Sequence, residues 1–407
     1  MMIKIGSETV AQKYSEKIRK FKGSRNFSNE LLRYKSFFKK TKVKTVACII
    51  VIILIVTGIY IYKRYQSFDS YKVIDAIKVD SGTDSKYEAY GDFVIKYSSD
   101  GISYIDGEET VWDESFEMKS PIVDICGDYI AAADKNTNDI YIYDKDGKVG
   151  KASASYPIIK IEVASQGVVA ALLEDTNANY IEVFDKEGNK LVSHKTLLNE
   201  NGYPLNFSLA ENGAKMIVSY VTINSGVIRN KILFYNFSST GSNSSDKVAG
   251  EFNQYEETLV PMVQFVSENY AVAVGENVLS IYNMKKKPSL KKELKFKDEI
   301  EKVFYSNKYI GFVFKNTNNK KPYRIEVYNL NGKRIMETDV NTSYENITFS
   351  GENVLMYDDM NCKIISFKGV EKFSYIFKGQ INNIIPVDGK RTFLFMSNSK
   401  IQKVRLK

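Results

Sequence analysis

A phrase of alternating apolar residues and turns recurs along most of this chain, and it constrains the fold more than any other feature. Each copy opens at a turn followed by an apolar run, as in Gly91-Asp-Phe-Val-Ile and Gly127-Asp-Tyr-Ile-Ala. Successive openings lie 36 to 56 residues apart. The openings begin at Gly91, Gly127, Gly167, Gly213, Asn269, Lys308, Glu352 and Lys390. Repetition at this period indicates an array of similar supersecondary units rather than one large core.

The second strand of each phrase and the turn after it mark the repeat most clearly. This segment reads Ile-Tyr-Ile-Tyr-Asp-Lys-Asp-Gly at 140–147, Ile-Glu-Val-Phe-Asp-Lys-Glu-Gly at 181–188 and Ile-Glu-Val-Tyr-Asn-Leu-Asn-Gly at 325–332. Alternation with period two predicts β-strands. Asp or Asn with Gly three residues later predicts a hairpin, because the Asx side chain bonds its own backbone and Gly adopts positive φ. Four short strands per repeat of about 40 residues is typical of β-propeller blades.

The two ends of the repeat region are expected to combine in one blade. After Lys390 the chain holds two predicted strands, 392–396 and 401–405, and residues 68–80 precede the first full repeat. Residues 68–80 can supply the missing outer strands, which would cover two otherwise exposed sheet edges. Seven continuous blades and one composite blade make eight, or seven if the long unit at 213–268 has a different register. We therefore predict an all-β propeller of about eight, alternatively seven, four-stranded blades over residues 68–407.

An uninterrupted apolar segment precedes the repeats. No charged residue occurs among the 18 residues 45–62, and a helix of this length spans roughly 27 Å, close to the bilayer core of about 30 Å. We expect one transmembrane helix in the lipid bilayer here. Its membrane-embedded residues include Val46, Ile49, Ile53, Val56 and Ile61. The 44 residues before it are too many for the n-region of a cleaved signal peptide, so an uncleaved signal anchor is predicted.

The positive charge of the chain lies in its N-terminal tail. Residues 1–44 contain thirteen Lys or Arg against three Glu, so the remaining 363 residues carry −2 of the total charge of +8. A nucleic-acid partner is therefore not expected, since such binding needs a basic surface on the folded domain. The tail either sets topology alone, forms basic amphipathic helices on an anionic leaflet, or docks a cytoplasmic partner.

Basic residues flank the apolar segment unequally, which predicts its orientation. Four lysines lie just before it, whereas only two basic residues follow before the first acids. The flanking residues are Lys39, Lys40, Lys42, Lys44, Lys63 and Arg64. Under the positive-inside rule, the tail lies in the cytoplasm and residues 63–407 lie outside the cell, with 63–67 as a linker. We therefore predict a single-pass cell-membrane protein with an extracellular C-terminal domain.

Residue types for catalysis or metal binding are scarce. The single histidine, His194, limits His-ligated zinc or His-dependent nucleophilic catalysis to one centre, and the three cysteines contain no CxxC pair. Adjacent acids such as Asp358 and Asp359 point to opposite faces of a strand and do not converge. Paired hairpin acids such as Asp144 and Asp146 fit turns better than a calcium site, which needs about six to eight oxygens. We expect no catalytic residue, no metal and no small-molecule cofactor, and hence no enzyme.

Two segments stand out as interaction surfaces. The segment 285–297 carries seven lysines and one glutamate, and it could bind an anionic wall polymer or lipid headgroups, or form a solvated hairpin. Its lysines are Lys285, Lys286, Lys287, Lys291, Lys292, Lys295 and Lys297. A low-complexity loop at 238–246 interrupts the longest repeat, and inserted loops in repeat proteins often lie on the binding face.

The hairpin turns and aromatic strands resemble those of the WD40/PQQ-like superfamily over residues 68–407, although the lone Trp112-Asp113 pair has no partnered Gly-His. A closer likeness covers the whole chain. It is similar to an uncharacterised family of single-pass membrane proteins from Gram-positive bacteria, known as a domain of unknown function. The matching segments are Phe-Tyr-Asn-Phe at 234–237, Gly241 and Val-Pro-Met-Val-Gln-Phe at 260–265. This resemblance implies topology and fold but no activity.

Together these features predict an anchored extracytoplasmic propeller that binds or scaffolds envelope proteins or polymers without catalysis. Two alternatives remain open at this point. A carboxylate-based hydrolase of envelope glycans would require acidic residues converging at the mouth of the central channel. A transmembrane sensor would instead signal through the cytoplasmic tail.

Overall fold

The computed structural model divides the chain into two compact units, Met1–Gln66 and Ser67–Lys407. The structure describes residues 45–62, 64–79, 85–91, 93–107, 109–198, 201–224, 226–238, 247–255, 258–316, 320–389 and 391–407. The predicted apolar segment forms a helix over Thr45–Tyr62 whose residues are all exposed, and within the described residues it is the one helix long and apolar enough to cross a membrane. The predictions for the tail 1–44, with Lys39, Lys40, Lys42 and Lys44, and for Lys63 lie outside the described residues.

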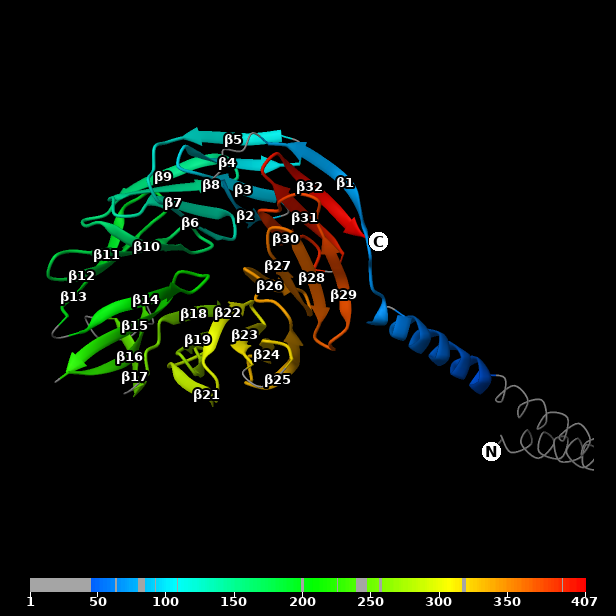
Figure 1. The fold of residues 1–407 in the computed structure, drawn as a ribbon. Coiled ribbons are helices and arrows are strands. Elements are labelled where there is room, and N and C mark those ends of the chain that lie inside the picture. The colour runs from blue at the N-terminus through cyan, green and yellow to red at the C-terminus, as the bar shows by residue number, and fades with distance from the viewer. Residues whose placement is uncertain are drawn as a thin grey trace, which may run out of the picture. The chain divides into compact units, whose positions relative to one another are not determined.

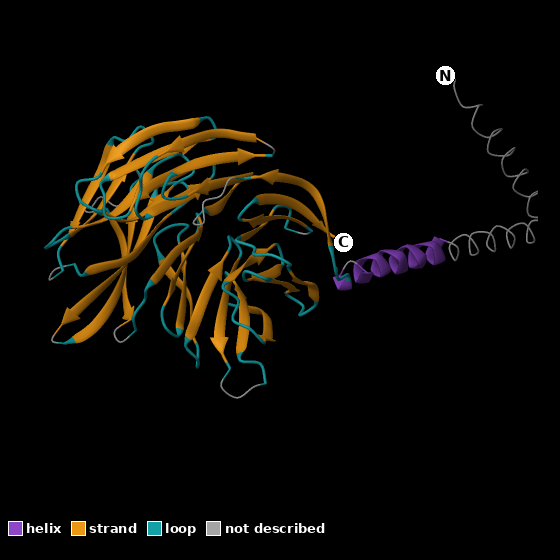
Figure 2. Ribbon diagram, turned by 45° about the horizontal axis from the view of Figure 1, so that its top comes forward, coloured by secondary structure: helices purple, strands orange, loops and turns teal. Residues whose placement is uncertain are grey.

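The second unit consists of eight antiparallel four-stranded sheets arranged as the blades of a propeller (Figure 1; Figure 2). Blade one holds β2 (Lys86–Tyr90), β3 (Phe93–Tyr97), β4 (Gly101–Asp106) and β5 (Glu109–Ser115); blade two β6 (Pro121–Cys126), β7 (Tyr129–Asp134), β8 (Asp139–Asp144) and β9 (Gly147–Ser153); blade three β10 (Ile158–Val163), β11 (Val169–Glu174), β12 (Asn179–Phe184) and β13 (Lys190–Thr196); blade four β14 (Tyr203–Leu209), β15 (Lys215–Asn224), β16 (Val227–Asn236) and β17 (Val248–Tyr255). Blade five holds β18 (Met262–Ser267), β19 (Tyr270–Val274), β20 (Val278–Asn283) and β21 (Ser289–Lys295); blade six β22 (Ile300–Tyr305), β23 (Tyr309–Lys315), β24 (Tyr323–Asn329) and β25 (Arg334–Val340); blade seven β26 (Asn346–Ser350), β27 (Asn353–Tyr357), β28 (Asn361–Ser366) and β29 (Glu371–Ile376); blade eight β30 (Asn383–Pro386), β31 (Thr392–Ser397), β32 (Lys400–Leu406) and β1 (Tyr71–Lys78). The predicted number of eight blades is confirmed.

The chain begins each blade at the centre of the ring and proceeds outward. The first strands of neighbouring blades lie against one another, as β6 does against β10 and β14 against β18. The predicted openings of the repeat fall on the second strand of each blade, and the marked Ile-Glu-Val segments are third strands. The sequence phrase is thus displaced by one strand from the blade, because a period alone does not determine where a repeat unit begins.

The long unit at 213–268 holds three strands of blade four, β15, β16 and β17, and the first strand of blade five, β18. Its length comes in part from β15 and β16, which have ten residues each. Residues 239–246 of the predicted low-complexity loop 238–246 lie outside the described residues. This unit therefore does not reduce the number of blades to seven.

The apolar core is divided among the interfaces between blades. Each of eight buried clusters combines side chains of two neighbouring blades. The last of these joins Tyr87 and Val94 of blade one to Leu394 and Met396 of blade eight. Because this cluster links the final blade to the first one, the ring is closed.

The closing blade combines both ends of the unit, as predicted, but with a different division of strands. The C-terminal part supplies three strands and residues 71–78 supply one, so the prediction of two strands from each end was wrong. The missed strand is β30, which has four residues and ends at Pro386. Its alternation is too short to be recognised in the sequence.

Strand β1 forms the outer edge of this blade. It pairs with β32 from Tyr71 opposite Leu406 to Lys78 opposite Lys400. The ring of Tyr71 packs edge-on against Tyr375 and Phe395, with centroids 5.1 Å apart in both cases.

Successive strands of each blade run in opposite directions, so their turns lie on two distinct faces of the ring. One carries the turns between first and second strands and between third and fourth strands. Residues 67–70 join the ring there, where Phe68 N donates to Lys372 O at 2.7 Å and Asp69 N to Lys407 O at 3.3 Å. We call this the N-terminal face. The opposite face carries the turns between second and third strands and the connections between blades.

The closing strand is expected to determine the stability of the whole ring. A fragment starting at Ser67 keeps every described core cluster, whereas one starting at residue 80 lacks β1 and exposes the edge of β32. We expect the shorter fragment to lose at least about 3 kcal/mol of unfolding free energy, given about 1.5–3 kcal/mol per buried large side chain. Urea unfolding followed by circular dichroism measures this loss. Equal stability of the two fragments would contradict closure by β1.

Candidate functional site

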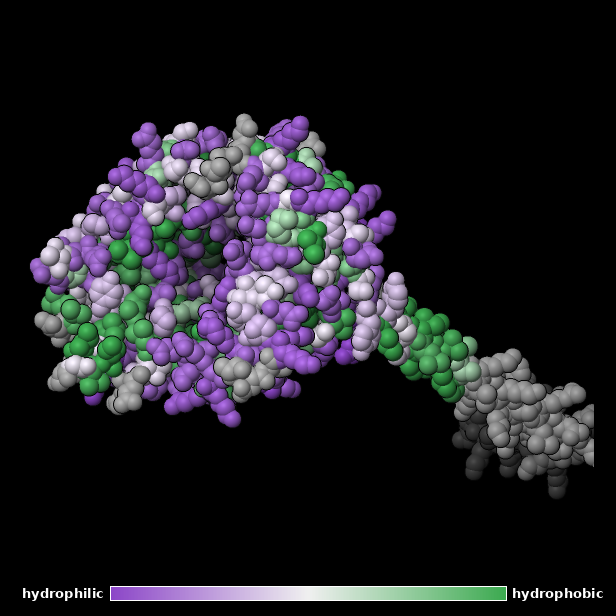
Figure 3. All heavy atoms as spheres, in the orientation of Figure 1, coloured by the Kyte–Doolittle hydropathy of each residue, from purple (hydrophilic) through white to green (hydrophobic). Residues whose placement is uncertain are grey.

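A hollow lies at the centre of the ring, and Figure 3 shows it lined by polar and apolar side chains. Tyr305, the last residue of inner strand β22, is 42 % exposed. The pKa of its hydroxyl is nevertheless raised to about 12, first by burial and then by the carboxylates of Glu162 and Asp124. These two acids lie on the inner strands of blades three and two, on another side of the ring. Tyr305 therefore faces them across the central channel.

A series of hydrogen bonds from backbone N–H groups to side-chain oxygens joins the inner strands of blades two to five. In each bond a side chain of one inner strand accepts from a backbone N–H of the inner strand of the next blade. The donor residue directly follows the position that, in its own strand, corresponds to the acceptor. The pairs are Val163 N to Asp124 Oδ2 at 2.6 Å, Leu209 N to Glu162 Oε2 at 2.6 Å and Phe265 N to Ser208 Oγ at 3.0 Å. Inner strands of different blades share no sheet, so these bonds link them directly and satisfy otherwise unpaired backbone donors.

Lys160 completes the polar lining beside Glu162. Its Nζ lies 2.8 Å from Glu162 Oε1 and donates to Asn206 Oδ1 and to Phe207 O, both at 2.7 Å. Farther around the ring, the Tyr305 hydroxyl donates to Gln264 Oε1 at 2.9 Å. The channel thus presents acids, amides, a lysine and a phenol, which suits a polar ligand better than an apolar one.

Asp124 is the most strongly perturbed carboxyl group of this lining. Burial, followed by the neighbouring Glu162, raises its pKa to about 7, against the opposing effects of the Val163 N–H and Lys160. Acidic residues therefore do come together at the channel, as the hydrolase alternative requires. Both carboxylates, however, already hold a backbone N–H of the next blade, so their observed role is to position the inner strands.

The structure divides the seven lysines predicted as an interaction surface. Lys285, Lys286 and Lys287 are exposed in the turn between β20 and β21, on the N-terminal face. Lys291 is half-buried in β21, where its Nζ donates to Asn331 Oδ1 of the next blade at 2.6 Å and lies 4.3 Å from the ring centroid of Tyr270. The remaining members, Lys292, Lys295 and Lys297, continue along the outer strand β21 and into the connection on the opposite face. The seven lysines do not form one patch.

Lysines on an outer strand also have a structural use. An unpaired sheet edge invites pairing with another chain, and lysine side chains discourage it. Lys292 and Lys295 lie on the free edge strand of blade five, and this accounts for them without a ligand.

The other polar residues considered from the sequence have local partners. His194 Nε2 lies 3.3 Å from the Tyr235 hydroxyl. Asp144 Oδ1 accepts from Asp146 N at 2.8 Å, which is the turn bond expected there. Cys126 and Cys362 are free thiols, and burial raises both pKa values, that of Cys126 to about 11. In the described part of the chain, no group of three or more His, Cys, Asp or Glu residues is placed to hold a metal.

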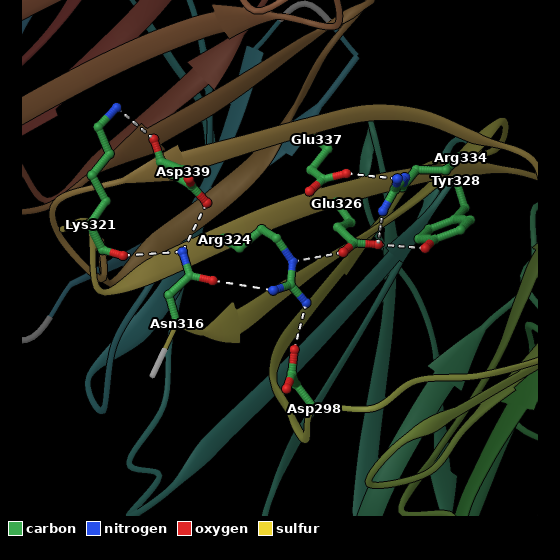
Figure 4. A network of polar contacts seen from close by, with 9 residues as sticks. All are labelled: Asp298, Asn316, Lys321, Arg324, Glu326, Tyr328, Arg334, Glu337 and Asp339. Carbon is green, nitrogen blue, oxygen red and sulfur yellow. Dashed lines mark hydrogen bonds and ion pairs between the residues drawn. The ribbon is translucent and has the colours of Figure 1, made fainter. Parts of the chain in front are cut away.

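Sequence reasoning missed the buried glutamates of the Ile-Glu-Val segments. Figure 4 shows the network around Glu326 on β24. Glu326 is 4 % exposed, and it accepts from Arg324 Nε at 2.7 Å and from the Tyr328 hydroxyl, with Arg334 Nη1 3.5 Å away. Arg324 also pairs with Asp298 at 2.8 Å, in the connection from blade five.

Glu182 occupies the same position in blade three. It is 1 % exposed and lies 2.7 Å from Lys190 Nζ of the outer strand. Burial raises its pKa, but the hydrogen bonds from Lys190 and Ser155 outweigh that effect and lower it. In both blades the glutamate fastens the third strand to the outer strand. The signal in the sequence was a glutamate repeated inside an otherwise apolar strand.

The described fold can be compared with known proteins. The chain belongs to the family of unknown function DUF5711. The family model matches residues 64–406, which is the whole propeller. No curated protein matches the chain.

Solved structures show similarity in fold. Sqt1 of Chaetomium thermophilum, in a crystal structure bound to the N-terminus of the ribosomal protein L10, aligns with a TM-score of 0.54 at 10% identity, covering 83% of this chain and 100% of that one. Sqt1 alone gives a TM-score of 0.54 at 9% identity, covering 83% and 98%. Hydrazine synthase of Kuenenia stuttgartiensis gives 0.44 at 9% identity over 76% and 96%. The expected likeness to WD40-type propellers is confirmed for the fold.

Removing the ionisable group of Asp124 is expected to change how stability depends on pH. Because the folded pKa of about 7 lies above the unfolded value, the stability that Asp124 contributes is fully present below the unfolded pKa. It is lost as pH rises through 7. Asn keeps an oxygen to accept the Val163 N–H. Between pH 5 and 8 the wild type should therefore lose about 2.5 kcal/mol relative to Asp124→Asn.

Urea unfolding at each pH measures this difference. Asp128→Asn, in an exposed turn of the same blade, is the matched control and should follow the wild type. Parallel pH profiles for Asp124→Asn and wild type would refute the raised pKa.

Glu326→Gln is expected to destabilise the ring because it leaves Arg324 and Arg334 without a buried counter-charge. The cost should be about 3 kcal/mol. The control Glu337→Gln removes an exposed partner of Arg334, 2.7 Å from it, and should cost less than about 1 kcal/mol. Thermal or urea unfolding distinguishes the two. Equal losses would mean that burial of Glu326 does not matter.

Proposed function

We propose that this protein is a membrane-anchored, extracytoplasmic binding scaffold for envelope proteins or polymers. The observation that supports it is a closed propeller preceded at once by a helix long and apolar enough to span a bilayer. The basic residues before that helix favour a cytoplasmic N-terminus. The propeller is then held outside the cytoplasm, where its two faces and its channel are available to partners.

A segment of another protein is the partner that we favour. The similar propeller Sqt1 has been solved bound to the N-terminus of a ribosomal protein, and a propeller presents many turns around one polar channel. Here Tyr305, Gln264, Asn206 and Lys160 supply hydrogen-bonding groups in that channel. Such a lining suits the backbone and polar side chains of an extended peptide.

We propose that the binding function is not catalytic. The raised pKa of Asp124 beside Glu162 is the one observation that favours a hydrolase, since glycosidases use a protonated and an ionised carboxyl group. Both carboxyl groups accept a hydrogen bond from a backbone N–H of the next blade, which argues for a structural role. The sensor alternative depends on the tail 1–44, which lies outside the described residues.

Affinity capture after chemical cross-linking of intact cells tests this proposal. The tagged full chain should recover at least one envelope protein or wall polymer that an anchor-only control, residues 1–70, does not recover. Recovery of cytosolic proteins alone, or of the same material by both chains, would contradict an extracytoplasmic scaffold. Release of soluble sugar from isolated wall material by the purified protein would support the hydrolase instead.

A further inference from the structure

The N-terminal face of the ring carries charge of opposite sign on its two sides. The turns of blades five, six and seven on this face hold six lysines against two glutamates, a net charge of +4. The lysines are Lys285, Lys286, Lys287, Lys308, Lys333 and Lys368, all exposed, and the acids are Glu268 and Glu352. We call these six lysines the basic sector. The corresponding turns of blades two and three hold four acids, Asp128, Asp146, Asp185 and Glu187, against Lys145 and Lys186, a net charge of −2.

We propose that the basic sector binds the anionic lipid headgroups of the membrane that holds the anchor helix. This inference rests on the proposed membrane anchoring. It adds a specific surface, a ligand class and an orientation of the ring, with blades five to seven toward the bilayer and blades two and three turned away from it.

The lysines of the basic sector are available for such binding. No ion pair joins any of the six to an acid within the described residues, unlike Lys190 or Lys363, which lie 2.7 and 2.9 Å from carboxylates. Lys285, Lys286 and Lys287 are consecutive in one turn, so three positive charges are concentrated there. A lysine near an anionic bilayer surface raises the binding constant roughly fivefold, and the contributions of several lysines multiply.

The covalent path from the helix keeps this face near the bilayer. Helical structure extends to Tyr65, and Phe68 N already donates to Lys372 O of blade seven. The three residue steps between Tyr65 and Phe68 reach at most about 10 Å even when fully extended. Lys368, in the turn just before Lys372, therefore cannot lie far from headgroups if the helix spans the membrane. That reach is comparable with the Debye length of about 8 Å at physiological ionic strength.

The same reach favours lipid over a wall polymer as the ligand. A polymer could approach either face of the ring and either side of it. The basic sector instead lies on the face where residues 67–70 join the ring, and it extends from blade seven, which binds Phe68. The acidic turns on the other side of this face would be repelled by an anionic leaflet, so the charge pattern also favours one tilt of the ring.

Hydrogen exchange of the full chain in lipid nanodiscs tests the proposal. We compare discs of zwitterionic phosphatidylcholine with discs that also contain anionic phosphatidylglycerol. Amides in the turns of the basic sector should exchange at least about threefold more slowly in the anionic discs, and the protection should disappear at about 0.5 M salt. Turns of blades two and three should exchange equally in both discs.

Two variants with the same change in net charge separate a site from a general charge effect. K285E/K286E/K287E should abolish the protection at that turn. The control K119E/K297E/K378E replaces exposed lysines in connections on the opposite face, and it should keep the protection. Equal exchange in both lipids, or equal loss in both variants, would overturn the proposal.

Two further results identify other failures. In one further experiment, a soluble polyanion such as poly(glycerol phosphate) is added to the zwitterionic discs. If the polyanion protects the basic sector and anionic lipid does not, the sector binds a polymer, and the lipid site is overturned. Failure of the chain to co-elute with either disc would refute the anchor itself. Flotation of the same chain with anionic vesicles would then test the basic sector alone, and absence of flotation would refute it.

Discussion

The pairing of β1 with β32 is the interaction on which the rest of the structure depends. A propeller blade has no stable core of its own, because its apolar side chains are buried only against its neighbours. Closure of the ring gives every blade a neighbouring blade on both sides. In this chain the last blade has three strands until residues 71–78 add the fourth. The edge of β32 is covered, and Tyr71 completes an aromatic cluster with Tyr375 and Phe395.

Closure also involves the chain segment that follows the N-terminal helix. The closing strand begins only a few residues after the helix, so the segment that would enter the membrane is contiguous with the segment that closes the ring. Phe68 packs at the start of β29, where its N–H bonds to Lys372. A force that pulls on the N-terminal helix would thus be resisted by the hydrogen bonds of β1 to β32 and of Phe68 to the start of β29. Farther inside, Asp124, Glu162 and Ser208 join successive inner strands, so the channel lining and the ring share the same residues.

Much of this architecture could be predicted from the sequence, and the reasons for the exceptions are physical. The hairpins at 140–147, 181–188 and 325–332 revealed the strand type because turn chemistry is local, and the eight repeat openings gave the period and the number of blades. The phase of the repeat and the short strand β30 could not be found, since a period has no intrinsic origin and four residues carry too little alternation. The lysines at 285–297 are adjacent in sequence, yet a turn and an edge strand separate them. The channel could not be predicted at all, because Asp124, Glu162 and Tyr305 meet only through ring closure.

The central claim is the proposal that the N-terminal helix spans the membrane and that the propeller lies on its extracellular side. Labelling of single introduced cysteines with a membrane-impermeant maleimide tests it most directly. In intact cells, a cysteine at exposed Lys119 of the propeller should react fully, whereas a cysteine at Ser7 of the tail should react only after lysis. Labelling of the tail but not of the propeller in intact cells would contradict the account.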